Sequence, residues 1–276
     1  MNNIVKSNRT IYTASDFAKE SLIYLQEIGE SKTLQKHISS RENLDSFLFF
    51  IILDGDGELN YNNQKYKLKK GSIVFIDCSK QYSHMSDNWT IKWIHFNGNN
   101  VKQIYDKYIL RNGLNIFQSN QFNKYESLIN DIQIISNSND YMKDMNIYEK
   151  LTQLLSLLLS ETIYRNENTN KRLYDISIIK NYIDDNYLNN ISLDEISYKY
   201  FINKFYLTKL FKLNYGTTIN NYIMQKKITK AKELLRFSDL NIEDISIECG
   251  IKDNNYFSRV FKQIEGITPK EYRTKW

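Results

Sequence analysis

One stretch of the chain, residues 191–266, repeats itself and therefore constrains the fold more than any other feature. Residues 191–197 (ISLDEIS) return as residues 240–246 (LNIEDIS), and residues 207–212 (LTKLFK) return as residues 257–262 (FSRVFK). The two offsets are 49 and 50 residues, so the turn is one residue longer in the second copy. A segment that recurs in this way predicts two copies of one supersecondary unit.

Each copy starts with a short helix. Ser192 and Asn241 belong to the residue types that cap helices, and an acidic residue follows each of them three positions later, as at many helix starts. Apolar residues then recur at helical spacing. Ser197 and Ser246 are small residues at matched positions, where a second helix can cross closely. Two short helices joined by a tight turn are typical of a helix-turn-helix unit.

The second helix of each copy has an apolar face and a polar face. The apolar positions Leu207 and Phe211 repeat as Phe257 and Phe261, so this face is expected to pack inward. Any surface helix has a polar face, but here the same kind of polar face occurs twice. Its side chains can bind base edges and phosphates in a major groove. We expect DNA contacts from Asn203, Lys204, Phe205, Thr208, Lys209, Lys212, Asn254, Asn255, Ser258, Arg259 and Lys262.

The last part of the chain carries two motifs, GIKDNNYFSRVFK at residues 250–262 and GITPKEYR at residues 266–273. They resemble the signature of the AraC/XylS family of bacterial transcription regulators, and the resemblance covers about the last hundred residues. It implies an all-α DNA-binding domain in which one long helix joins two helix-turn-helix units. We place that helix at residues 219–237 and expect its apolar stripe to pack on both units.

The chain departs from the family pattern at a few positions. Phe201 stands where the first turn usually has glycine, Lys227 where the joining helix usually has arginine, and Ser197 and Ser246 where alanine is common. We expect Phe201 to adopt a positive φ angle, which costs a non-glycine residue about 1 to 2 kcal/mol.

Charge is distributed unevenly along the 276 residues. Residues 1–169 hold 19 basic and 19 acidic residues, whereas residues 170–276 hold 18 and 13, so the net charge of +5 lies in the half that carries the repeat. Excess positive charge there suits contact with phosphates. The two cysteines, Cys78 and Cys249, favour a reduced cytoplasmic protein. No signal peptide or apolar run of about 20 residues is visible, so we expect no membrane partner.

The N-terminal part of the chain is patterned mainly as strands. We interpret residues 1–20 as a polar arm, with a short strand or helix within residues 17–28. A hairpin turn is expected at Asn62 and Asn63. Residues 55–96 resemble the jelly-roll cupin barrel that serves as the sensor domain of many AraC-type regulators. Strands are predicted at residues 46–53, 58–61, 64–68, 72–76 and 90–96.

The barrel is predicted to bind a ligand and to have no catalytic residue. Metal-dependent cupins take histidines and a glutamate from their first motif, but residues 55–70 contain no histidine. We therefore expect no metal, no cofactor and no enzymatic activity.

The predicted ligand site follows from strand alternation and from the family resemblance. Trp89, Trp93 and His95 share one face of their strand. In sugar-binding members a tryptophan matching Trp93 stacks on the ligand, and an arginine roughly matching Arg41 reaches it. Such residues suit a polyhydroxylated or carboxylated effector, although both tryptophans could equally be core or interface residues. The predicted ligand-binding residues are Arg41, His84, Trp89, Trp93 and His95.

Helical periodicity follows the barrel, at residues 101–108, 122–132 and 147–158. The last two helices resemble the dimerisation element of the family, and they could also serve as a cover for the barrel. Residues 165–172 are polar and without periodicity, which is typical of a linker.

Together these patterns predict an α+β chain. Residues 1–164 would form a jelly-roll cupin-like β-barrel with a helical dimerisation element, residues 165–172 a linker, and residues 173–276 the double helix-turn-helix domain. We expect a cytoplasmic homodimeric regulator that binds double-stranded DNA, a small-molecule effector such as a sugar, and RNA polymerase. The family leans toward activators. The alternatives are a ligand-independent architectural DNA binder and a cupin enzyme with an appended DNA-binding domain.

Overall fold

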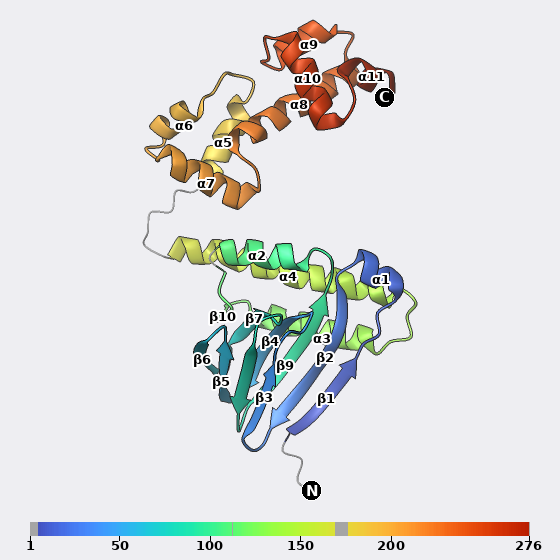
Figure 1. Ribbon diagram of the computed structural model, residues 1–276, viewed down its shortest axis with the longest axis vertical. Coiled ribbons are helices and arrows are strands. Elements are labelled where there is room, and N and C mark those ends of the chain that lie inside the picture. The colour runs from blue at the N-terminus through green and yellow to red at the C-terminus, as the bar shows by residue number, and fades with distance from the viewer. Residues whose placement is uncertain (1–4, 112, 169–175, 276) are drawn as a thin grey trace. The chain divides into compact units, whose positions relative to one another are not determined.

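The computed structural model describes residues 5–111, 113–168 and 176–275, and the chain divides into two compact units, Met1–Asn170 and Lys171–Trp276 (Figure 1). The strands of the first unit are β1 (Val5–Ile11), β2 (Tyr24–Thr33), β3 (His37–Arg41), β4 (Phe47–Asp54), β5 (Asp56–Tyr61), β6 (Gln64–Lys69), β7 (Ile73–Asp77), β8 (Tyr82–Ser86), β9 (Thr90–Asn97) and β10 (Ile116–Phe117). Its helices are α1 (Asp16–Ser21), α2 (Val101–Leu110), α3 (Phe122–Ser136) and α4 (Lys143–Asn168). The second unit contains α5 (Ile176–Asn186), α6 (Leu193–Lys199), α7 (Lys204–Tyr215), α8 (Ile219–Phe237), α9 (Ile242–Glu248), α10 (Asn254–Glu265) and α11 (Pro269–Lys275).

The strands of the first unit form two antiparallel sheets. A six-stranded sheet has the order β1-β2-β9-β4-β7-β10, and a four-stranded sheet has the order β3-β8-β5-β6. Side chains of β4 alternate between two cores: Phe49 and Ile51 pack toward the helices, whereas Phe50 and Ile52 pack between the sheets. Burial on both faces explains the continuous apolar run of β4. The α+β class and the jelly-roll barrel are confirmed.

Helices α2, α3 and α4 lie against one face of the six-stranded sheet (Figure 1). Tyr125 and Ile129 of α3 and Leu151 and Leu155 of α4 are buried in one core with Phe49 of the sheet. The apolar stripes of both helices are thus used to cover the barrel, which was one of the two roles expected for them. Their role in dimerisation stays a prediction.

The expectation of a polar arm at the N-terminus is wrong for residues 5–11, because they form β1. This strand pairs in register with β2 from Val5 opposite Thr33 to Ile11 opposite Glu27. Most of its side chains are exposed, so its sequence lacks the alternation that marks a half-buried strand. Strands β3 and β8 were not predicted either, whereas the hairpin turn is confirmed, with Asn62 and Asn63 at φ angles of 51° and 61°.

The predicted linker lies around the boundary between the two units, which falls at residues 170 and 171. Helix α4 extends to Asn168, so residues 165–168 are helical. Residues 169–172, and residues 173–175 at the predicted start of the second domain, lie outside the described residues.

The second unit confirms the duplicated motif. Ser192 and Asn241 cap α6 and α9, and their side chains accept hydrogen bonds from the backbone N–H groups of Glu195 and Asp244. Helix α8 has the predicted bounds and contributes to two separate cores. Its N-terminal half packs with α5, α6 and α7, and its C-terminal half packs with α9, α10 and α11.

The two helix-turn-helix turns are built alike. The Ser197 hydroxyl donates to the carbonyl oxygen of Ile202 at 2.5 Å, and the Ser246 hydroxyl donates to that of Ile251 at 2.9 Å. Serine therefore ties each turn to its first helix, which alanine could not do. Phe201 has the predicted positive φ angle, 51°, and the second turn has glycine, Gly250, at 68°.

Candidate functional site

The exposed faces of α7 and α10 carry two matching stripes. On α7 the stripe is Phe205, Thr208, Lys209 and Lys212, which are spaced i, i+3, i+4 and i+7. Leu207 and Phe211 lie on the opposite face and are fully buried. On α10 the matching stripe is Asn255, Ser258, Arg259 and Lys262.

The four basic residues of the stripes are available for an anionic partner. Lys209, Lys212, Arg259 and Lys262 are all exposed. Within the part of the chain that the structure describes, none of them has a carboxylate within salt-bridge distance, although Arg259 lies over the Tyr256 ring at 5.6 Å. Two cations one turn apart on each helix suit contacts to phosphates and base edges.

Three other predicted DNA-binding residues lie outside the stripes, and two of them, Asn203 and Lys204, have contacts inside the protein. The Asn203 side chain caps α7 by accepting from the backbone N–H of Phe205 at 2.9 Å. Lys204 pairs with Asp194 of α6 at 2.7 Å. Asn254 is half-buried, and its Oδ1 atom has no hydrogen-bond partner among the residues described. Asn203 and Lys204 thus stabilise the start of α7, and the stripes present the remaining eight predicted residues.

Lys227 of α8 is buried at the junction of the two helix-turn-helix units. Its side-chain amine donates to the carbonyl oxygen of Gly250 at 2.8 Å, and burial lowers the pKa of Lys227. The backbone of Leu188, after α5, lies beside Gly250. Sequence spacing alone did not reveal that this lysine links α8 to the second turn.

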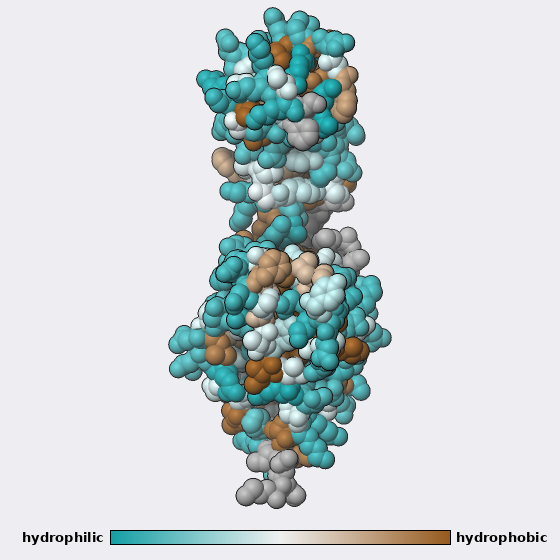
Figure 2. Space-filling model, turned by 90° about the vertical axis from the view of Figure 1, so that its right-hand side faces the viewer, coloured by the Kyte–Doolittle hydropathy of each residue, from teal (hydrophilic) through white to brown (hydrophobic). Residues whose placement is uncertain are grey.

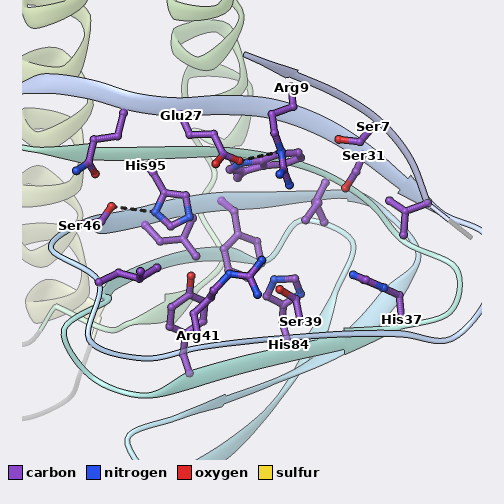
Figure 3. Close-up of a pocket in the computed structure, with 18 of the residues that line it drawn as sticks. Ser7, Arg9, Glu27, Ser31, His37, Ser39, Arg41, Ser46, His84 and His95 are labelled. Atoms are coloured by element: carbon purple, nitrogen blue, oxygen red, sulfur yellow. Dashed lines mark hydrogen bonds and ion pairs between the residues drawn. The ribbon is translucent and has the colours of Figure 1, made fainter. Parts of the chain in front are cut away.

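The interior of the barrel contains a cavity of about 1110 Å³ between the two sheets (Figure 3). All five predicted ligand-binding residues line it: Arg41, His84, Trp89, Trp93 and His95. Arg41 comes from the end of β3, His84 from β8, and Trp93 and His95 from β9. The alternation expected for β9 is therefore correct, and the structure brings the five side chains around one space.

Glycines make room for the two indoles that line the cavity. Gly29 of β2 lies opposite Trp93, and a Cβ atom there would be 2.6 Å from the indole ring. A Cβ atom at Gly57 would likewise be 2.6 Å from the ring of Trp89. Each indole can thus lie close against a neighbouring strand.

Arg9, Glu27 and Asp45 are charged residues of the cavity wall that were missed from the sequence, and the first two form an ion pair. The Arg9 guanidinium pairs with Glu27 at 3.1 Å, and Trp93 Nε1 donates to the same carboxylate at 2.9 Å. Arg9 also lies over the Trp93 ring at 5.6 Å. Figure 3 shows Arg9 and Arg41 reaching into the cavity from opposite walls. Arg9 therefore lies over one face of the ring on which a ligand was expected to stack.

Two histidines of the cavity, His84 and His95, have lowered pKa values. Burial is the main cause that lowers the pKa of both His84 and His95 to about 4. His95 Nδ1 is 2.9 Å from the Ser46 hydroxyl. His84 packs against Phe50 and Trp89, and its Nδ1 atom is buried without a hydrogen-bond partner in the described part of the chain.

We expect the first unit to lose stability as the pH falls from about 6.5 to about 4. The unfolded chain takes up protons at the ordinary histidine pKa of 6.5, whereas the folded unit does so only near 4. Protonation therefore favours the unfolded state across this window. The measurement is the thermal midpoint from tryptophan fluorescence, to which Trp89 and Trp93 of the first unit contribute, at several pH values.

The variant His84→Gln should flatten this pH dependence. Lys36→Gln is the control, because Lys36 is exposed next to β3 and does not line the cavity, so it should leave the dependence intact. An unchanged slope in His84→Gln would contradict the assignment.

Among the described residues, no group of three histidine, cysteine, aspartate or glutamate side chains is placed to hold a metal ion. No helix in the described ranges is long and apolar enough to cross a membrane. Hydrophilic residues dominate the visible face of both units, with hydrophobic residues scattered among them (Figure 2).

A barrel with an internal cavity, followed by two helix-turn-helix units, defines a class of DNA-binding regulators with a separate ligand-binding domain. Residues 24–176 match the family model described as the AraC-like ligand binding domain, and residues 196–275 match one described as a helix-turn-helix domain. The first match spans more than half of the chain. This protein belongs to the AraC family of transcription regulators.

Individual relatives match only part of the chain. It is 44% identical over 70 residues to the HTH-type transcriptional activator RhaR of Cronobacter sakazakii, which is 25% of each protein. The RhaR protein of Yersinia pseudotuberculosis is 43% identical over 70 residues. The match thus covers about a quarter of these relatives.

Solved structures include both partial and nearly complete matches. The C-terminal domain of the response regulator yesN from Fusobacterium nucleatum is 37% identical and covers 35% of this chain and 95% of that one, with a TM-score of 0.34. ToxT from Vibrio cholerae covers 99% of this chain and 98% of its own, at 16% identity and a TM-score of 0.33.

Proposed function

We propose that this protein is a ligand-responsive transcription regulator that reads double-stranded DNA with α7 and α10. The observation that carries the proposal is the duplicated exposed stripe on two helices that α8 joins. At 1.5 Å per residue, the 19 residues of α8 span about 28 Å. This length is comparable to the ~34 Å between successive major-groove segments on one side of a duplex. One chain can then read two adjacent segments.

We further propose that the cavity binds a small-molecule effector with hydroxyl or carboxylate groups, such as a sugar. Arg41 supplies a forked donor, and Trp89 and Trp93 supply flat aromatic surface. The metabolism of carbohydrates or other small molecules is the proposed target of regulation. Action as an activator has support from relatives that are transcriptional activators.

A homodimer and contact with RNA polymerase complete the proposal. Ile134 and Tyr141 are 71% and 93% exposed near the connection between α3 and α4, which supports an interface there.

The test of the proposal is DNA selection with the full chain from a random pool, followed by a search for effectors. Thermal shift against a panel of sugars and sugar acids reports effector binding. A pool that shows no enrichment would overturn the proposed function. An enriched site together with no thermal shift from any compound would favour a ligand-independent architectural DNA binder.

Arg41→Ala is expected to abolish the thermal shift caused by the effector and to leave DNA binding within about threefold, a change of less than 1 kcal/mol. Arg41 lines the cavity of the first unit, whereas the stripes of α7 and α10 belong to the second unit. Lys36→Ala is the control, since Lys36 is an exposed cation near β3 outside the cavity lining. Equal losses of effector response and of DNA affinity would show that Arg41 has a structural role.

A further inference from the structure

Phe205 is an aromatic side chain presented to solvent at the start of α7. It is the second residue of the helix and is 84% exposed. Asn203 fixes this first turn, because its side chain accepts from the backbone N–H groups of Phe205 and Tyr206 at 2.9 and 3.2 Å. The N-terminal end of a recognition helix is the part that reaches base edges. A large apolar group held there, in water, points to an apolar partner.

The two stripes differ in chemical character at one matched position, which is Phe205 in the first unit. Three of the four matched positions keep their character: hydroxyl with hydroxyl, and cation with cation at two positions. Only the first position changes in kind, from phenylalanine to an amide. The matched pairs are Phe205 with Asn255, Thr208 with Ser258, Lys209 with Arg259, and Lys212 with Lys262.

Thr208 adds to the apolar character of the first stripe. Its hydroxyl donates to the backbone carbonyl of Lys204 at 2.9 Å, within the helix. Because the hydroxyl is used within the helix, the methyl group is the part of the Thr208 side chain that is left to contact a partner. Thr208 lies one helical turn after Phe205 on the same face.

We propose that Phe205, with the methyl group of Thr208, reads the C5-methyl group of thymine. Thymine is the one base with a methyl group in the major groove, and phenylalanine and threonine methyl groups are suited to contact it. The second unit instead has Asn255, an amide that forms paired hydrogen bonds with adenine. The α7 unit thus selects bases by apolar contact, and the α10 unit selects them by hydrogen bonds. This inference rests on the proposed DNA-binding function.

The experiment replaces thymines by deoxyuridine, which lacks only the methyl group. The full chain is used with the DNA site that selection from a random pool yields, and each thymine is replaced in turn. Wild-type affinity should fall about fourfold at one or two positions of a single half-site, as expected from loss of one buried methyl group. In Phe205→Ala those positions should become insensitive to the replacement, and Phe205→Asn should raise the preference for adenine there.

Phe201→Ala is the matched control. Phe201 is an equally exposed phenylalanine, 85%, but it lies in the turn before α7. It should keep the wild-type sensitivity to deoxyuridine. An enriched site that is insensitive at every thymine, or a Phe205→Ala protein that stays sensitive, would overturn this inference and leave the proposed function standing. Absence of any enriched site would overturn the proposed function itself.

Discussion

Gly250→Ala is expected to destabilise the second unit by about 3 to 5 kcal/mol, a range that only defined packing or backbone defects reach. Gly250 has a φ angle of +68°, which costs alanine about 1 to 2 kcal/mol. An added Cβ atom would also lie 2.0 Å from the carbonyl oxygen of Leu188 and 3.0 Å from the amine of Lys227. Relief of this overlap requires a shift of backbone, because the nearest atom is a carbonyl oxygen.

Two other variants separate the effect of overlap from that of the φ angle. Gly216 ends α7 at a φ angle of +73° with no atom within 4 Å of an added Cβ, so Gly216→Ala should cost only about 1 kcal/mol. Phe201→Gly removes the strain at 51° and should be close to neutral or stabilising. The stability of all three variants is measured by urea unfolding of the full chain, with the circular dichroism signal of the helices as the readout. Equal losses in Gly250→Ala and Gly216→Ala would exclude the contact with Leu188 as the cause.

Arg259→Ala is expected to weaken specific DNA binding by about 1 to 3 kcal/mol, the value of a good bidentate base contact. Arg259 is exposed at the centre of the α10 stripe, and it has the planar fork that matches guanine. Specificity should relax in one half of the site only. Competition of the selected site against random DNA, with each half-site varied separately, measures the change.

Lys262→Ala provides the contrast for Arg259. Lys262 lies near the C-terminal end of the same stripe, so we expect phosphate contact. Its removal should weaken binding to all DNA sequences alike. The slope of log affinity against log salt concentration should fall by about one. Lys270→Ala, an exposed cation on α11, serves as control. The model of a base contact fails if Arg259→Ala weakens random and selected DNA equally.

The elements that could be predicted from the sequence are those in which buried apolar residues recur at a regular spacing. The bounds of α8 and the caps of α6 and α9 follow from local residue types and spacing. Strands β1 and β3 lie at sheet edges, where most side chains face solvent and apolar alternation is absent. Their pairing with β2 and β8 is a long-range property that no local pattern specifies.

In the candidate sites, too, residues marked by a local pattern were predicted, and residues brought together by long-range pairing were not. The α7 and α10 stripes were found because the repeat gave an internal comparison. Trp93 and His95 of the cavity were found by alternation within β9. Arg9 and Glu27 could not be found in this way, because their meeting depends on the register of β1 with β2.

Helix α8 is embedded in both helix-turn-helix cores, and this fixes a rotational phase as well as a distance. Insertion of one residue into α8 would turn the second unit by about 100° and move it by about 1.5 Å. No hinge in the helix absorbs such a change, since Ile219 and Ile223 anchor one end and Ala231 and Leu235 the other. Under the proposed function, the length of α8 therefore sets the number of base pairs between the two half-sites, and a different operator spacing would require both cores to be repacked together.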